Sequence, residues 1–344
     1  MKALVYGGPG KRSWEEKPRP KLQDPGDAII RITTTTICGT DLHILKGDVP
    51  EVPTGRILGH EGVGIVEEVG PAVSNVAVGD KVLLSCITSC GRCDFCKRSM
   101  YSHCRNGGWI LGRLIDGTQA EYVRIPFADT STYKLPKDAN EDAMVMLSDI
   151  FPTGYEVGVR NAEVKPGDVV AIVGAGPIGL SVLLTAQLYS PAELIMIDLD
   201  PNRLAVAKSF GATSTFDASQ PDLAKTLIDR TGGGVDVAVE AVGIPATFDL
   251  CQRILAPGGH LANVGVHGKP VQLEIEKLWI QNITLRTGLV DTYSTPQLLD
   301  MVNAGKLEPT KMATHRFTLA DAMKAYDTFG AAAREKAIKV VLHA

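Results

Sequence analysis

The stretch VVAIVGAGPIGLSVLLTAQ, residues 169–187, sets the architecture of the second half of the chain. Apolar residues run from Val169 to Val173, and Gly174, Gly176 and Gly179 then form the pattern G-x-G-x-x-G ahead of an apolar, helix-like segment. In this context the glycines allow a tight turn, the close approach of a pyrophosphate and close packing of helix on strand. The stretch therefore predicts a strand, a glycine turn and a helix whose N-terminus attracts a phosphate.

The sequence on either side of this turn predicts two domains. Downstream, strands and helices alternate, which is typical of a doubly wound parallel sheet of the Rossmann kind. The expected strands cover residues 194–198, 213–216, 235–243 and 260–266, and the expected helices cover residues 201–211, 221–232 and 247–259. Upstream, residues 1–135 contain short strands rich in Val, Ile and Thr, separated by Gly, Pro and Asp, as in an all-β module. The predicted fold class is α/β.

The residue that ends the second strand of this sheet bears on the choice of cofactor. Asp198 lies 19 residues beyond Gly179, where a carboxylate accepts hydrogen bonds from the hydroxyl groups of an adenosine ribose. A 2′-phosphate would meet like charge there, from Asp198 and also from Asp200. The segment therefore favours NAD over NADP, although the glycine turn alone also fits a flavin or S-adenosylmethionine.

Five of the seven cysteines lie in CITSCGRCDFCKRSMYSHC, residues 86–104. Four of them follow the spacing C-x2-C-x2-C-x7-C, which suits a closed, tetrahedral structural zinc site: Cys90, Cys93, Cys96 and Cys104. A [4Fe–4S] cluster shares the first spacings but usually continues as C-x3-C-P, which is absent here. Unliganded thiols are the remaining alternative. Cys86 does not fit the spacing and is predicted to be a small buried residue in a strand over residues 81–86.

Composition and charge exclude several classes of partner. The 344 residues suffice for about two domains, and 35 basic against 39 acidic residues give a net charge of −4. This balance argues against nucleic acid as a partner. The N-terminal apolar run is too short for a signal peptide, and no apolar stretch is long enough to span a membrane. We therefore expect a cytoplasmic protein, in which clustered reduced cysteines more often bind metal than form disulfides.

Three other segments contain possible metal ligands: ICGTDLH at residues 37–43, GHEG at residues 59–62, and SDIFPTG at residues 148–154. A thiolate from Cys38, an imidazole from His60 and a carboxylate from Asp149 would suit zinc and leave a fourth position open. Taken singly, each signal is weak. Cys38 and His60 also read as core residues, and Asp149 also reads as a cap of the following helix.

Together, ICGTDLH, GHEGVGIVEEVG, the four-cysteine segment and VGAGPIGL resemble the zinc-dependent alcohol dehydrogenases of the medium-chain dehydrogenase/reductase superfamily. The resemblance covers essentially the whole chain. It implies that Cys38, His60 and Asp149 bind catalytic zinc, with Glu61 next to the metal and able to replace water as a ligand. It further implies that Thr40 and His43 relay the alcohol's proton to solvent and that Asp41 orients His60.

The resemblance also implies the domain boundaries and the remaining contacts. A GroES-like catalytic domain spans residues 1–150, contains the zinc lobe at about 86–108 and is completed by residues 290–344, while residues 151–289 form the Rossmann domain. The implied cofactor and pocket residues are Gly174, Gly176, Pro177, Ile178, Gly179, Asp198, Arg203, Thr153 and Val264 for NAD, and Trp109 and Leu289 for the substrate. Aspartate at position 149 is similar to the bacterial secondary-alcohol dehydrogenases, which implies a homotetramer.

These observations predict an enzyme with two zinc ions per chain that interconverts alcohols with aldehydes or ketones, using NAD. Zinc would act as a Lewis acid, and the nicotinamide would accept a hydride. A polyol, aminoalcohol or threonine dehydrogenase shares all of these motifs and is the alternative within the class. A zinc-free quinone reductase or a crystallin-like binding protein on the same fold is the alternative from another class, and the ligand set argues against it.

Overall fold

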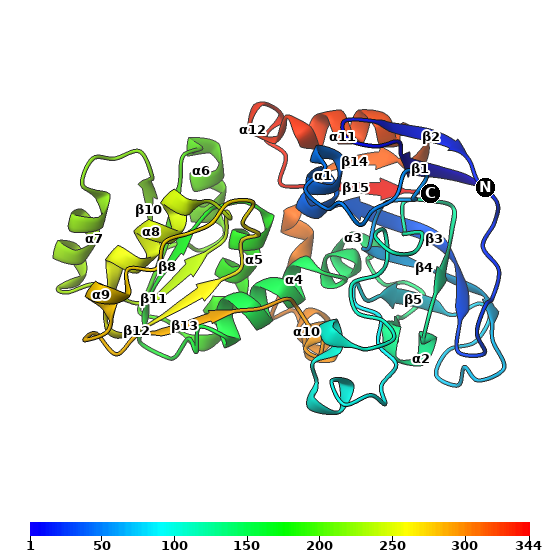
Figure 1. Ribbon diagram of the computed structural model, residues 1–344, viewed down its shortest axis with the longest axis horizontal. Helices are drawn as coiled ribbons and strands as arrows, with labels where there is room; N and C mark the ends of the chain where they lie inside the picture. Colours follow the sequence, from blue (N-terminus) through cyan, green and yellow to red (C-terminus); the bar gives the residue numbers. More distant parts are fainter. The chain divides into compact units, whose positions relative to one another are not determined.

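The computed structural model describes residues 1–344, and the chain separates into two compact units (Figure 1). The first unit comprises Met1–Asp149 and Asp291–Ala344, and the second comprises Ile150–Val290. Each unit has its own sheet and its own buried apolar core. No helix has the length and apolar composition needed to cross a bilayer.

The second unit contains six parallel strands in the order β10-β9-β8-β11-β12-β13. In chain order within the unit this is 3-2-1-4-5-6, the order of a dinucleotide-binding doubly wound sheet. The strands are β8 (Val169–Val173), β9 (Glu193–Asp198), β10 (Ser214–Asp217), β11 (Val235–Glu240), β12 (Leu255–Asn263) and β13 (Thr284–Thr287). The predicted α/β fold class is confirmed.

Helices connect these strands; those near residues 177–187, 201–211, 221–232 and 247–259 were predicted, and the short helix over residues 275–278 was not. The helices are α4 (Ile150–Thr153), which continues into a π-helical segment (Gly154–Arg160), and α5 (Pro177–Ala186), α6 (Pro201–Ser209), α7 (Leu223–Thr231), α8 (Pro245–Ile254) and α9 (Ile275–Leu278). Local signals explain several of their ends. Proline occupies the first turn of α5, α6 and α8, where a missing N–H costs no hydrogen bond. Asp200 caps α6 by accepting a bond from the Asn202 amide.

The first unit contains a mostly antiparallel sheet in the order β14-β15-β3-β4-β5-β7, with β6 also pairing with β3 and a separate pair β1-β2. Its strands are β1 (Lys2–Tyr6), β2 (Arg12–Glu16), β3 (Ala28–Ile37), β4 (Gly62–Val69), β5 (Lys81–Leu84), β6 (Tyr122–Ile125), β7 (Thr132–Lys134), β14 (Ala313–Thr318) and β15 (Lys339–His343). Its helices are α1 (Gly39–Lys46), α2 (Ala128–Ser131), α3 (Glu141–Met144), α10 (Thr295–Asn303), α11 (Ala322–Gly330) and α12 (Ala332–Glu335).

The C-terminal segment is part of this first sheet. Strand β15 pairs antiparallel with β3, with Val340 opposite Ile37. Helices α1 and α11 pack their apolar faces into one core with β1, β3 and β15, through residues that include Ile44 and Tyr326. The last 30 or so residues therefore hold in place the end of β3 from which the first candidate metal ligand projects.

Several element boundaries differ from the sequence expectation; the strand expected over residues 235–243 ends at Glu240, and the strand expected over residues 260–266 runs from Leu255 to Asn263. The strand expected over residues 81–86 ends at Leu84, so Cys86 lies beyond it. The helix expected to reach residue 259 ends at Ile254, because Leu255 has extended dihedrals and begins β12. Pro257, which follows at once, disfavours helix at the residue before it. Strands β2, β7, β13 and β14 were not predicted, since all are short or lack a continuous apolar pattern.

Candidate functional site

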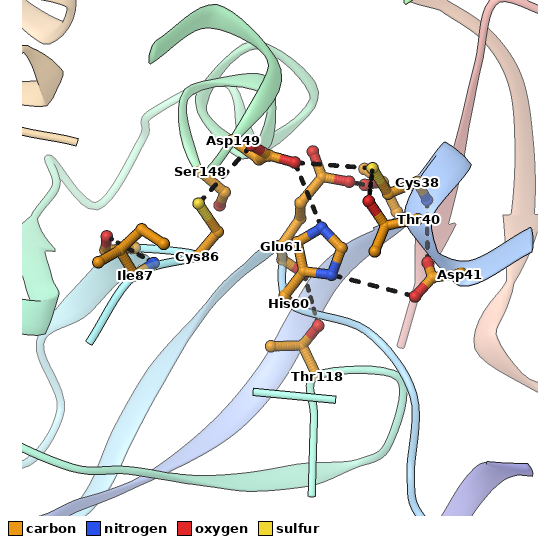
Figure 2. Close-up of polar contacts among 12 residues, drawn as sticks. Cys38, Thr40, Asp41, His60, Glu61, Cys86, Ile87, Thr118, Ser148 and Asp149 are labelled. Atoms are coloured by element: carbon orange, nitrogen blue, oxygen red, sulfur yellow. Dashed lines mark hydrogen bonds and ion pairs between the residues drawn. The ribbon is translucent and has the colours of Figure 1, made fainter. Parts of the chain in front are cut away.

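The structure brings Cys38, His60 and Asp149 together in the first unit. Cys38 follows β3 and begins α1, His60 lies just before β4, and Asp149 directly precedes α4. Their ligand atoms all lie within 4.8 Å of one another. Asp149 Oδ2 is 3.2 Å from His60 Nε2 and 3.6 Å from Cys38 Sγ (Figure 2). Segments about 20 and 90 residues apart in sequence thus converge on one point.

The chemistry of this group fits a bound cation. All three residues are buried, and a buried carboxylate beside a thiol that ionises to bind metal needs a compensating positive charge. Burial alone would lower the pKa of His60, but its hydrogen bond to Asp149 and the nearby Cys38 outweigh burial and raise this pKa well above its usual range. Sulfur, nitrogen and oxygen ligands, three in number, are the set that catalytic zinc uses with one position left open.

Asp41 faces the other ring nitrogen of His60, at 4.0 Å between Oδ1 and Nδ1. Its Oδ2 accepts bonds from the Cys38 amide and from Gln119 Nε2. Tyr326, on α11, donates in turn to Gln119 Oε1 at 2.7 Å. Asp41 thus contacts the segments of both His60 and Cys38, as expected of a residue that orients a ligand. Sequence reasoning missed Gln119 and Tyr326, because neither belongs to a motif.

Glu61, next to His60 in sequence, forms a fully buried ion pair. Lys339 Nζ on β15 lies 2.5 Å from Glu61 Oε2, and both side chains are 1% exposed. Thr36 also donates to this oxygen. Burial alone would lower the pKa of Lys339, but Glu61 and, more distantly, Cys38 raise it above its usual range. Lys339 was not predicted as part of this site, because its partner lies 278 residues away.

Thr40 and His43 lie on helix α1, one turn apart. The Thr40 hydroxyl is 3.7 Å from Cys38 Sγ, at the metal-ligand end of the helix. His43 Nδ1 is 2.8 Å from Asp48 Oδ2, and the His43 side chain is 37% exposed. One residue therefore lies at the candidate ligand and the other reaches solvent.

Of the two predicted pocket residues, Trp109 lies at this site. Its ring meets that of His60 edge-on, with centroids 6.4 Å apart. The guanidinium carbon of Arg113 lies over the Trp109 ring, 4.9 Å from its centroid. Leu289 belongs to the second unit, after β13, and is about half exposed.

The four predicted structural ligands also gather, with their sulfur atoms within 4.8 Å of one another. No disulfide joins them. Burial disfavours the Cys90 thiolate, yet hydrogen bonds from the Arg92 amide and the Asn106 side chain lower its pKa to about 6. Burial and the neighbouring Cys93 raise the pKa of Cys96 to about 12. Four thiolates at this spacing repel one another unless a cation joins them, so the group fits a single zinc ion with Zn–S bonds of about 2.3 Å.

In the second unit the glycine turn joins β8 to α5. Gly174 has a φ of +108°, and a Cβ there would lie 2.6 Å from Val242. A Cβ at Gly179 would lie 1.7 Å from the Gly174 carbonyl oxygen, so helix and strand pack closely only with glycine. At Gly176 the nearest atom to such a Cβ is Arg203 Nη1, at 3.9 Å. The space over Gly176, beside a guanidinium and the α5 N-terminus at Pro177, fits a pyrophosphate.

Asp198 is tied to this turn. Its Oδ2 accepts the Ala175 amide at 2.7 Å, and its Oδ1 accepts the Asp200 amide at 2.8 Å. Arg203 Nε lies 4.0 Å from Asp200 Oδ2. A carboxylate has about four acceptor sites, so Asp198 retains capacity for a ribose. The predicted nicotinamide contacts lie elsewhere in the unit: Thr153 ends α4, and Val264 follows β12, its amide donating to the Glu240 carbonyl.

Comparisons with known proteins agree with this arrangement. The alcohol dehydrogenase GroES-like domain matches residues 24–137, and the zinc-binding dehydrogenase family matches residues 177–304. Zinc-type alcohol dehydrogenase B of Aspergillus flavus is 35% identical over 98% of this chain and 81% of its own length.

Solved structures give the same picture. The apo form of zinc dependent alcohol dehydrogenase 2 from Streptococcus pneumonia is 55% identical, with a TM-score of 0.96 over 100% of this chain and 98% of its own. A zinc-binding dehydrogenase from Sinorhizobium meliloti 1021, bound to NADP, is 28% identical, with a TM-score of 0.88 over 100% of this chain and 99% of its own. The chain therefore belongs to the zinc-type alcohol dehydrogenases of the medium-chain dehydrogenase/reductase superfamily, oxidoreductases that use zinc and a nicotinamide cofactor.

Proposed function

We propose that this enzyme reversibly oxidises primary and secondary alcohols to aldehydes and ketones with NAD, and that each chain holds two zinc ions. The proposal rests on one observation: the ligand atoms of Cys38, His60 and Asp149 lie close together and are buried. Three such ligands leave one zinc position for the substrate oxygen. The four-cysteine group is closed and would hold the second, structural ion.

At the first site, Cys38, His60 and Asp149 would hold a zinc ion, which supplies Lewis-acid polarisation of the alcohol oxygen. Asp41 would fix the orientation of His60 through its contact with Nδ1. Lys339 neutralises Glu61 beside the ligands, which limits the negative charge of the pocket.

The alcohol must lose a proton as well as a hydride. The Thr40 hydroxyl, next to Cys38, is placed to accept that proton. His43 would release it to solvent, because its imidazole lies one turn further along the helix and is 37% exposed. Both groups lie on helix α1, and Asp41 on the same helix accepts a bond from the backbone amide of Cys38, which precedes the helix. One short helix therefore carries both groups of the proposed proton route.

The cofactor is proposed to be NAD. The ribose end of the site contains Asp198 and Asp200, and a 2′-phosphate would be repelled by both. Gly176 leaves room for the pyrophosphate beside Arg203. Thr153 and Val264 would contact the nicotinamide.

The substrate pocket is proposed to include Trp109, which lies against His60. Apolar side chains of this kind favour small or aryl alcohols over sugars, since a polyol would leave its hydroxyl groups unpaired there. A polyol, aminoalcohol or threonine dehydrogenase is the alternative.

We also propose a cytoplasmic homotetramer. Seven free cysteines suit a reducing compartment. In the second unit, Ile275, Trp279 and Ile280 are 60%, 70% and 67% exposed, on and just after α9, and the edge strand β13 follows them. An exposed apolar group beside an unpaired strand edge is typical of a subunit interface.

Steady-state kinetics on a panel of primary, secondary and polyhydroxy alcohols, with NAD and with NADP, test the proposed function. We expect the highest kcat/KM with simple alcohols and NAD. Selective oxidation of polyols or threonine would support the alternative instead. A wild-type enzyme that prefers NADP would contradict the assigned role of Asp198.

Asp198→Gly is expected to raise KM for NAD about tenfold to a hundredfold. The loss of hydrogen bonds to a charged group costs about 1.5–3 kcal/mol, and about 1.4 kcal/mol corresponds to a factor of ten. Discrimination against NADP should shrink, with Arg203 free to meet the phosphate. Asp198→Asn is the matched control: it keeps an acceptor for the Ala175 amide but loses the charge, so it should lose discrimination with a smaller rise in KM. Zinc content should not change in either variant.

A further inference from the structure

A second buried thiol contacts Asp149. Cys86 lies two residues beyond β5, is 2% exposed, and donates to Asp149 Oδ1 at 3.7 Å. The other oxygen, Oδ2, faces His60 and Cys38. The two oxygens of one carboxylate therefore have different partners, with Cys86 on one side and the candidate metal ligands on the other (Figure 2).

The contact between Cys86 and Asp149 is held by the main chain as well. The Cys86 amide donates to the carbonyl oxygen of Ser148, at 3.1 Å. The Ser148 hydroxyl accepts the Gly62 amide at 3.0 Å, which ties this segment to the residues that follow His60. Cys86 is thus attached to the Ser148–Asp149 segment at two points, and its side chain has a fixed place beside the carboxylate.

We propose that Cys86 is a positioning residue that holds Asp149 Oδ1 away from the metal, so that Asp149 binds through Oδ2 alone. This inference rests on the proposed function. Carboxylates bind metals through one oxygen or through two, and zinc accommodates a fifth ligand. Binding through both oxygens would add a fifth ligand to the ion and crowd the open position that the substrate needs. A weak donor on Oδ1 opposes that geometry without bringing a fourth protein ligand to the ion.

Cys86 is placed to act through Asp149 and not as a ligand itself. The compact group whose ligand atoms lie within 4.8 Å of one another consists of Cys38, His60 and Asp149. The Cys86 sulfur contacts the oxygen that points away from His60 and Cys38. Sequence reasoning assigned Cys86 to the core, which is correct for its burial, but missed this contact.

Cobalt(II) substitution tests the inference, because the visible absorption of cobalt(II) is strong with four ligands and several-fold weaker with five. The variants are Cys86→Ala, which removes the donor, and Cys86→Ser, which keeps one. Cys251→Ala is the matched control, since Cys251 is a fully buried cysteine on α8 in the other unit. The spectrum of cobalt-loaded Asp149→Ala, which retains only the four-cysteine site, is subtracted from each.

We expect the cobalt absorption of the catalytic site to fall several-fold in Cys86→Ala and to stay near the wild-type level in Cys86→Ser and Cys251→Ala. With zinc, kcat of Cys86→Ala should fall about tenfold to a hundredfold, as for other groups that orient metal ligands, while KM for NAD stays constant. An unchanged spectrum in Cys86→Ala would overturn the inference. Loss of a thiolate-to-cobalt charge-transfer band in Cys86→Ser would also overturn it, since Cys86 would then be a ligand. A wild-type spectrum with no four-ligand cobalt beyond that of Asp149→Ala would overturn the proposed function itself.

Discussion

Asp149→Ala is expected to lower kcat about a thousandfold and to reduce the zinc content to the single structural ion. Asp149 supplies the oxygen ligand, and its removal leaves only Cys38 and His60, too few protein ligands to retain a catalytic zinc ion. Loss of about 4 kcal/mol of Lewis-acid stabilisation corresponds to about three factors of ten. Binding of NADH, followed by its fluorescence, should be unchanged, because the glycine turn lies in the other unit.

A second buried carboxylate provides the control for this variant. Asp27, in the same unit, is 1% exposed and pairs with Arg124 at 3.0 Å. Asp27→Ala should destabilise the protein, since an unpaired buried charge remains, but should keep two zinc ions and kcat per folded molecule. If Asp149→Ala also keeps its metal and its rate, then Asp149 only caps the helix that follows it, and Glu61 becomes the better candidate for the third ligand.

Cys93→Ser is expected to have the largest effect on stability. Structural zinc contributes its binding free energy to folding, about 10–16 kcal/mol in isolated zinc-finger peptides. Loss of one ligand should therefore lower the free energy of unfolding by more than about 3 kcal/mol, and the zinc content should fall to one ion per chain. Activity per folded molecule should change much less, since the first ligand set is separate. Urea unfolding and metal analysis measure both effects.

Two comparisons make this result specific to the metal. A chelator should destabilise the wild type to about the level of Cys93→Ser and should destabilise that variant little further. Asp94→Asn changes the same lobe but removes only an exposed pair with Arg105, so it should change the stability little. A Cys93→Ser protein that is as stable as the wild type and holds both metals would show that the cysteine group is not a structural zinc site.

The sequence was sufficient to predict those parts of the fold and of the sites whose signal is local. The glycine turn and the cysteine spacing each lie within about 20 residues, and each strand or helix that follows the turn is a shorter segment still. Backbone geometry determines what each of these local patterns forms. The fold class and the family are confirmed. The residues of the two metal groups are gathered as the motifs indicate, and their roles remain predictions for the variants above.

The parts that the sequence did not reveal depend on contacts between distant segments. Lys339 lies in the strand AIKVVLH, where a lysine is normally exposed, and only its partner Glu61, 278 residues away, explains its burial. Tyr326 and Gln119 are 207 residues apart. Cys86 was predicted to be a core residue because a sequence does not distinguish a cysteine that is only buried from one that also contacts a carboxylate.

The most direct test of the account is the dependence of alcohol oxidation on zinc at the first site. Wild-type protein is treated with a chelator until only the structural zinc remains, and NADH formation from a simple alcohol is measured before and after one equivalent of zinc is added. We expect that activity is lost, that one equivalent of zinc restores it, and that Asp149→Ala does not respond. Alcohol oxidation at an unchanged rate without that zinc ion would contradict this expectation.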